Sequence, residues 1–121
     1  MKRNMDLVRE ILIKMEEHEQ GYAPNYLAIP GFTEEEIGYH CFLLNDAGLI
    51  DAADDSHAGS PSPSAIPLSL TWAGHEFIAN AKNENIWGQA KESIKKVGEV
   101  SFSVWASVLS EVVKNNLGIS G

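Results

Sequence analysis

The sequence predicts an α+β fold that is mostly α-helical, with a β-hairpin between two helical regions. Apolar residues alternate in "IPLSLT" and then recur at helical spacing in "LTWAGHEFI", so a strand runs directly into a helix at Thr71. An earlier strand, in "GLIDAADD", is joined to this one by "DSHAGSPSPS", which is polar and rich in turn-forming residues. Helical periodicity before and after the two strands predicts the remaining elements.

Two helices and a short extended segment are expected before the hairpin. Residues 3–18 carry apolar side chains at helical spacing and charges on the opposite side, which predicts an amphipathic helix. Two prolines bracket residues 26–29 and leave room only for a short edge strand. The next helix is predicted at 33–47, because "TEEE" has the pattern of a capping box and the glycine after "NDA" is a natural C-terminal stop.

Three more helices are predicted after the hairpin. Thr71 caps the first, and the others are expected at about 83–98 and 101–117. A helix, a short strand, a helix ending in "AGLI" and a hairpin follow the order of a winged helix, with the hairpin as the wing. This winged helix is abbreviated, because prolines interrupt residues 19–32 and leave no room for the extra helix of a full helix-turn-helix.

Four motifs occur in order along the chain: "MKRNMDLVREIL", "YHCFLLNDAGLI", "LTWAGHEFI" and "NIWGQAK". Together they resemble a family of small bacterial and prophage proteins that is catalogued as a domain of unknown function, number twenty-five thirteen. The resemblance covers nearly the whole chain and implies a phage or mobile-element context. It implies no particular catalytic or binding residues.

Length and composition narrow the class of protein. A chain of 121 residues suits one domain, so we predict a single domain over 1–121, with a winged-helix-like core at 1–71 and a helical C-terminal extension at 72–121. No apolar run approaches the ~18 residues of a membrane span, and the N-terminal segment has charges where a signal peptide is apolar. Cys41 is the single cysteine, which favours a reducing compartment. We expect a cytoplasmic protein of a bacterial host cell that does not bind membranes.

The net charge of −8 is unevenly distributed, since no Lys or Arg occurs between residues 15 and 81 whereas eleven acidic residues do. Seven of these acids fall on the predicted second helix and wing, and we expect them to form an acidic partner-binding surface: Glu34, Glu35, Glu36, Asp46, Asp51, Asp54 and Asp55. DNA affinity depends on neutralising phosphates with Lys and Arg, so this surface opposes DNA binding. Only Asn45 could contact a base edge there.

Apolar side chains on two predicted helices exceed what one core face requires. We expect them to be covered by a neighbouring helix, a protein partner or a second copy of the chain, and the candidates are Tyr39, Phe42, Leu43, Val104, Trp105 and Val108. For the C-terminal helix, packing within the monomer and sealing of a homodimer are near even alternatives, with a slight preference for the dimer.

No pattern in the sequence indicates an enzyme. The four histidines lack metal-ligand spacing, and His40 beside a core stripe is expected to be a buried, hydrogen-bonded imidazole. Asp54, Asp55 and His57 lie in a loop that would hold a cation poorly. No nucleophile elbow or phosphate-binding loop is present, so we predict no catalytic residues, no cofactor and no metal.

Two functional hypotheses therefore remain. The first is a non-enzymatic phage-type interaction module whose acidic surface binds a protein partner and so inhibits or regulates a host nucleic-acid-binding system. The second is a dimeric winged-helix transcriptional regulator that binds DNA. In that case basic residues outside the motif would have to contact the phosphates, and the candidates are Lys2, Arg3, Arg9, Lys91, Lys95 and Lys96.

Overall fold

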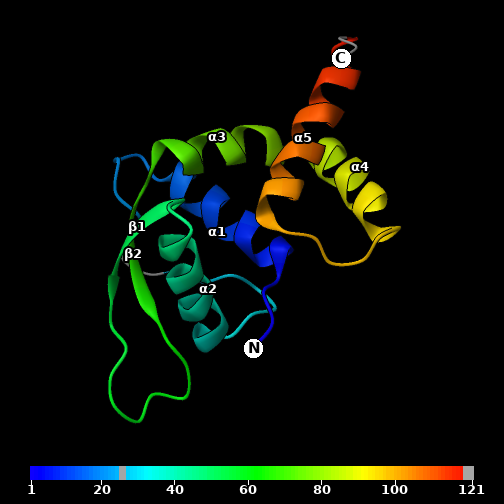
Figure 1. Cartoon of the computed structure of the whole chain (residues 1–121). Coiled ribbons are helices and arrows are strands. Elements are labelled where there is room, and N and C mark those ends of the chain that lie inside the picture. Colours follow the sequence, from blue (N-terminus) through cyan, green and yellow to red (C-terminus); the bar gives the residue numbers. More distant parts are fainter. Residues whose placement is uncertain (25–26, 119–121) are drawn as a thin grey trace. The chain divides into compact units, whose positions relative to one another are not determined.

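The computed structural model describes residues 1–24 and 27–118 (Figure 1). In this part of the chain the elements are α1 (Met5–Glu17), α2 (Glu34–Asp46), β1 (Ile50–Asp54), β2 (Ala65–Leu70), α3 (Trp72–Ala81), α4 (Glu84–Lys95) and α5 (Phe102–Asn116). The strands form an antiparallel two-stranded sheet. This order confirms the predicted fold class, which is α+β and mostly α-helical, with two helices before the hairpin and three after it.

The prediction of a short edge strand at 26–29 is wrong for those of its residues that the structure describes. Leu27–Ile29 belong to no strand, and Tyr26 lies outside the described residues. The side chains of Leu27 and Ile29 are nevertheless buried. Alternation of apolar residues here therefore reflects burial of side chains without the ladder of backbone hydrogen bonds that defines a strand. One backbone bond, from the N–H of Ala23 to the carbonyl of Leu68 at 2.7 Å, ties the preceding segment to β2.

The chain divides into two compact units, Met1–Glu76 and Phe77–Gly121, with the boundary inside α3. In the first unit, α1 packs on α2, and both helices contact the hairpin. In the second unit, α4 packs on α5, and the rings of Trp87 and Trp105 stack with centroids 4.6 Å apart. Whether the chain behaves as the single predicted domain stays a prediction. No helix in the described part combines the length and the apolar character needed to cross a membrane.

The junction between β2 and α3 is held by the side chain of Thr71. Its hydroxyl donates to the carbonyl of Gly48 at 2.6 Å and accepts the N–H of Gly74 at 3.1 Å, so the same oxygen caps α3 and binds the turn after α2. The backbone N–H of Thr71 also donates to the carbonyl of Leu49 at 3.1 Å. A Cβ at Gly74 would collide with this Leu49 carbonyl, so glycine permits the close approach. These contacts explain how a strand leads into a helix without an intervening loop.

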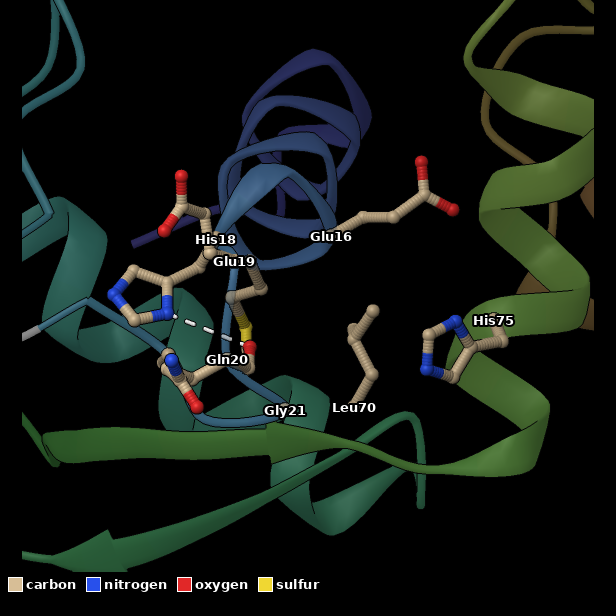
Figure 2. A pocket seen from close by; sticks show the side chains of 9 residues that line it. Glu16, His18, Glu19, Gln20, Gly21, Leu70 and His75 are labelled. Carbon is tan, nitrogen blue, oxygen red and sulfur yellow. Dashed lines mark hydrogen bonds between the residues drawn. The ribbon is translucent and has the colours of Figure 1, made fainter.

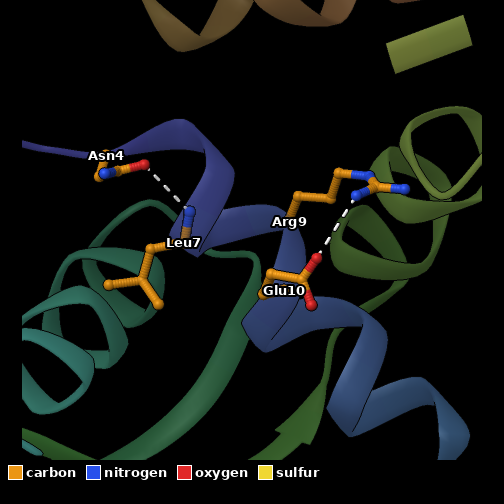
Figure 3. Close-up of polar contacts among 4 residues, drawn as sticks. All are labelled: Asn4, Leu7, Arg9 and Glu10. Atoms are coloured by element: carbon orange, nitrogen blue, oxygen red, sulfur yellow. Dashed lines mark hydrogen bonds and ion pairs between the residues drawn. The ribbon is translucent and has the colours of Figure 1, made fainter. Parts of the chain in front are cut away.

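His40 joins α2 to the start of α1. The ring is buried, its Nε2 lies 2.8 Å from the backbone N–H of Asn4, and its Nδ1 lies 2.8 Å from the carbonyl of Glu36. Because the Asn4 N–H can only donate, Nε2 accepts and Nδ1 carries the proton, which is the neutral imidazole. The expectation of a buried, hydrogen-bonded histidine is confirmed. Asn4 in turn caps α1 by accepting the N–H of Leu7 at 3.1 Å (Figure 3).

Candidate functional site

Helix α2 has a core face and an opposite face that carries predicted site residues of both kinds. The core face consists of Ile37, His40, Cys41 and Leu44, all of them buried. The opposite side of the same helix, at positions i, i+4, i+7 and i+11, carries Glu35, Tyr39, Phe42 and Asp46. We call these four residues the α2 stripe. The acidic and apolar groups that the sequence suggested separately therefore share one line along the helix.

Two aromatic side chains form the middle of the α2 stripe. The rings of Tyr39 and Phe42 are stacked, with centroids 6.5 Å apart and planes 17° apart. Both residues are half-buried, as is Leu43 beside them. Tyr39 also contacts the ring of His40 edge-on, at a centroid distance of 5.9 Å. The aromatic pair thus contacts the buried His40 ring through Tyr39, and part of its apolar surface remains exposed to solvent.

The three glutamates at the start of α2 differ in what they do. Glu36 completes the capping box: its Oε1 accepts the N–H of Thr33 at 2.9 Å, and the Thr33 hydroxyl accepts the N–H of Glu36 at 3.1 Å. The carboxylate of Glu36 is therefore used to begin the helix. Glu34 and Glu35 are exposed in the first turn. There, negative charge is favoured by the helix dipole, so these residues stabilise the helix while remaining accessible.

The hairpin runs beside α2 (Figure 1). Near the end of the helix, the Oδ1 of Asn45 accepts the N–H of Ala52 on β1 at 3.0 Å. Further back along the helix, Gly38 approaches Ser64 so closely that a Cβ at Gly38 would collide with the serine side chain. Asn45, the candidate for reading a base edge, is therefore engaged in holding the wing against α2.

Two of the three acidic residues of the wing lie on β1, and the third follows it directly. Asp51, Asp54 and Asp55 are all exposed. Asp54 accepts the N–H of Ser56 at 2.8 Å, and this bond lowers the pKa of the Asp54 carboxyl. Burial raises the pKa of the Cys41 thiol to about 12, with a smaller contribution from the negative charge of Asp55. Cys41 is therefore a protonated core residue and not an activated nucleophile.

The charge of the first unit is far from balanced. Residues 1–76 contain four basic and thirteen acidic residues, a formal charge of −9, whereas residues 77–121 contain five basic and four acidic residues, a formal charge of +1. The basic residues of the first unit are all in or before α1: Lys2, Arg3, Arg9 and Lys14. Arg9 pairs with Glu10 at 3.4 Å (Figure 3). The stripe and the wing thus carry carboxylates without any Lys or Arg on their own elements.

The apolar candidates in the second unit do not share one environment. Val104 is 43% exposed and Val108 is half-buried. Trp105 is only 7% exposed and stacks on Trp87, with an interplanar angle of 22°. Its place is the core between α4 and α5, so it is not part of an exposed dimer surface. Val104 in the first turn of α5 and Leu117, directly after the end of the helix, are nevertheless exposed.

A pocket that the sequence did not suggest lies between the end of α1, the segment after it and the start of α3 (Figure 2). Its volume is about 210 Å³, and it is lined by Met15, Glu16, His18, Glu19, Gln20, Gly21, Ala23, Leu70 and His75. The Nδ1 of His18 lies 3.4 Å from the carbonyl of Gln20. Within the described residues, no three His, Cys, Asp or Glu side chains are grouped so that they could hold a metal ion.

Comparison with known proteins connects this fold to one family. A family described as "Hypothetical protein (DUF2513)" matches residues 2–100. A relative from Haemophilus influenzae, described as "Uncharacterized protein", is 43% identical over 121 residues, which covers 97% of this chain and 99% of the relative. No solved structure matches the chain. The match confirms the resemblance seen in the four sequence motifs: the chain belongs to the DUF2513 family.

Proposed function

We propose that this protein is a non-enzymatic interaction module that binds a basic protein partner through the α2 stripe and the adjacent acidic wing. The observation that carries the proposal is the stripe itself, in which a stacked Tyr39–Phe42 pair stands between the carboxylates of Glu35 and Asp46. Partially exposed aromatic side chains are the usual anchors of protein interfaces, and charged residues around them select the partner.

The charge of the surface indicates the chemistry of the partner. Asp51, Asp54 and Asp55 extend the negative potential from the stripe across the wing, within a unit of formal charge −9. Such a potential repels the phosphates of DNA and attracts Lys and Arg side chains. A nucleic-acid-binding protein presents such side chains where it receives phosphate, so its binding surface fits this stripe. Regulation or inhibition of a host nucleic-acid-binding system would suit the mobile-element context implied by the family resemblance.

Affinity capture with matched variants tests the proposal. The tagged wild type is compared with Tyr39→Ser/Phe42→Ser and Glu35→Gln/Asp46→Gln, and bound host proteins are identified by mass spectrometry. Glu84→Gln/Glu92→Gln serves as the control, because it removes two charges from exposed residues of α4. We expect a basic protein that is retained by the wild type and the control, lost with both stripe variants and released by salt. Equal retention by all four proteins would overturn the proposal.

Two accompanying measurements exclude trivial outcomes. Circular dichroism shows whether the stripe variants remain folded, which the Glu35→Gln/Asp46→Gln pair should do because both residues are exposed. Electrophoretic mobility of random duplex DNA tests the DNA-binding alternative. A micromolar, salt-sensitive complex that is abolished by Lys95→Glu would favour the transcriptional regulator and contradict the proposal.

A further inference from the structure

The geometry points to a pH-sensitive contact in the first unit: we propose that protonation of His40 releases the segment before α1 from α2. The His40 ring is buried, and each of its nitrogens lies within 2.8 Å of a backbone group. The segment that the ring holds, residues 1–4, carries Lys2 and Arg3, two of the four basic residues of the first unit. The contact therefore determines whether this basic segment is held on α2. The inference does not depend on the proposed function.

The hydrogen bonds of His40 are compatible only with the neutral ring. Nδ1 donates to the carbonyl of Glu36, and Nε2 accepts the N–H of Asn4. In the imidazolium both nitrogens carry protons, so Nε2 would point its N–H at the N–H of Asn4. Two donors cannot share a hydrogen bond, and a buried charged donor without an acceptor is unfavourable. The bond to Glu36 survives protonation, because Nδ1 donates in both states. The ring therefore stays on α2, and the contact with Asn4 opens.

The surroundings of the ring favour protonation and release together. Burial lowers the pKa of His40, the carbonyl and the charge of Glu36 raise it, and the positive charge of Arg3 lowers it. Among the described residues, the charged side chains that act on the ring are thus Glu36 on its own helix and Arg3 on the segment that it holds. Release exposes the ring to water and moves Arg3 away, so it removes two effects that oppose the charged form. The contact should be closed above the ordinary pKa of 6.5 and should open as the pH falls below it.

Release of this segment does not require α1 to unfold. The side chain of Asn4 accepts the N–H of Leu7 at 3.1 Å, and its carbonyl accepts the N–H of Val8 at 3.1 Å (Figure 3). Neither bond involves His40, so the first turn of the helix keeps its cap. Leu7 and Val8 are also buried, which holds the helix in the core. Chain ends open at a lower free energy than packed helices do, so we expect a local opening.

NMR of the full chain between about pH 7.5 and about pH 5 tests the contact. The His40 ring should show the Nδ1–H tautomer at the upper pH. As the ring titrates, the amide resonance of Asn4 should shift with the same midpoint, and the heteronuclear NOE of Arg3 should fall because its backbone gains fast motion. The released fraction should rise at least about threefold over this range, since a group that titrates only when released allows up to about tenfold per pH unit. The amides of Leu12 and Cys41, in the packed helices, should keep their NOE values.

Two variants assign the effect to one imidazole. His40→Gln supplies a donor and an acceptor that do not titrate, so the Asn4 amide should no longer respond to pH. His75→Gln is the matched control, because it removes an exposed histidine of the same unit and should respond as the wild type does. An Asn4 amide that stays bound down to about pH 5 in the wild type would overturn the inference, whether or not the variants fold. So would an equal response in His40→Gln, or a loss of structure at Leu12 and Cys41 together with Asn4, which is global unfolding.

Discussion

Replacing Thr71 by valine should weaken the junction between β2 and α3. Valine keeps the shape of the side chain but removes the hydroxyl that donates to Gly48 at 2.6 Å and accepts from Gly74 at 3.1 Å. Loss of an N-cap costs about 1 kcal/mol, and loss of a second hydrogen bond costs about as much again. We therefore expect the free energy of unfolding to fall by about 2 kcal/mol, which lowers the Tm by about 6–12 °C for a chain of this size.

Thermal and urea unfolding followed by circular dichroism measure this effect. Thr71→Ser is the matched control, since it retains the hydroxyl and should remain within about 0.5 kcal/mol of the wild type. Gly74→Ala should be at least as damaging as Thr71→Val, because the added methyl group meets the backbone carbonyl of Leu49, which cannot rotate away. If Thr71→Val melted with the wild type while Thr71→Ser did not differ from either, the hydroxyl would not hold the junction and the reasoning would be refuted.

Three further predictions concern the core, the wing and pH. Trp105→Ala should lower the free energy of unfolding in urea by about 3–5 kcal/mol, because the stack on Trp87 is lost. Light scattering and thermal unfolding across a hundredfold concentration range should show whether the mass and the Tm of the wild type depend on protein concentration, as a dimer requires. Replacing residues 57–63 by a short Gly-containing turn should leave the Tm within a few degrees of the wild type, roughly on the scale for small domains, because the hydrogen bonds between Ser56 and Ser64 that close the loop are kept. A large drop in Tm would show that the loop packs on the rest of the first unit. Burial lowers the pKa of His40, so this imidazole takes up a proton near its ordinary pKa of 6.5 in the unfolded chain but not in the folded chain. The free energy of unfolding should therefore decline as the pH falls below 6.5, and His40→Gln should make this decline shallower. Parallel plots of unfolding free energy against pH for the two proteins would contradict the prediction.

The sequence predicted those elements whose signals are local. The capping box of Thr33 and Glu36, and the stop at Gly48 with its φ of +80°, place the ends of α2 to within one residue of the predicted bounds. The junction at Thr71 was predicted because a change of hydrophobic period and a capping residue coincide there. In each case neighbouring residues supply both the pattern and the hydrogen bonds, so no long-range information is needed.

Local sequence patterns do not predict the features that depend on tertiary contacts, or predict them only in part. The segment at Leu27–Ile29 has the alternation of a strand, but whether a partner strand is available cannot be read locally. The pocket joins the end of α1 to Leu70 and His75, about fifty residues away, and no spacing rule links them. By contrast, the α2 stripe follows from helical geometry once the helix bounds are known.

Site-specific photo-crosslinking from the α2 stripe tests the central claim most directly. Phe42 is replaced by p-benzoylphenylalanine in the full chain, and Val97, which is 78% exposed in the second unit, is replaced in a parallel control. After irradiation in host cells, we predict a crosslink from position 42 to a basic protein that is absent from position 97 and lost when Glu35→Gln/Asp46→Gln is combined with the probe. Crosslinks to DNA from position 42, or the same protein products from both positions, would contradict the assignment of α2 as an acidic protein-binding surface.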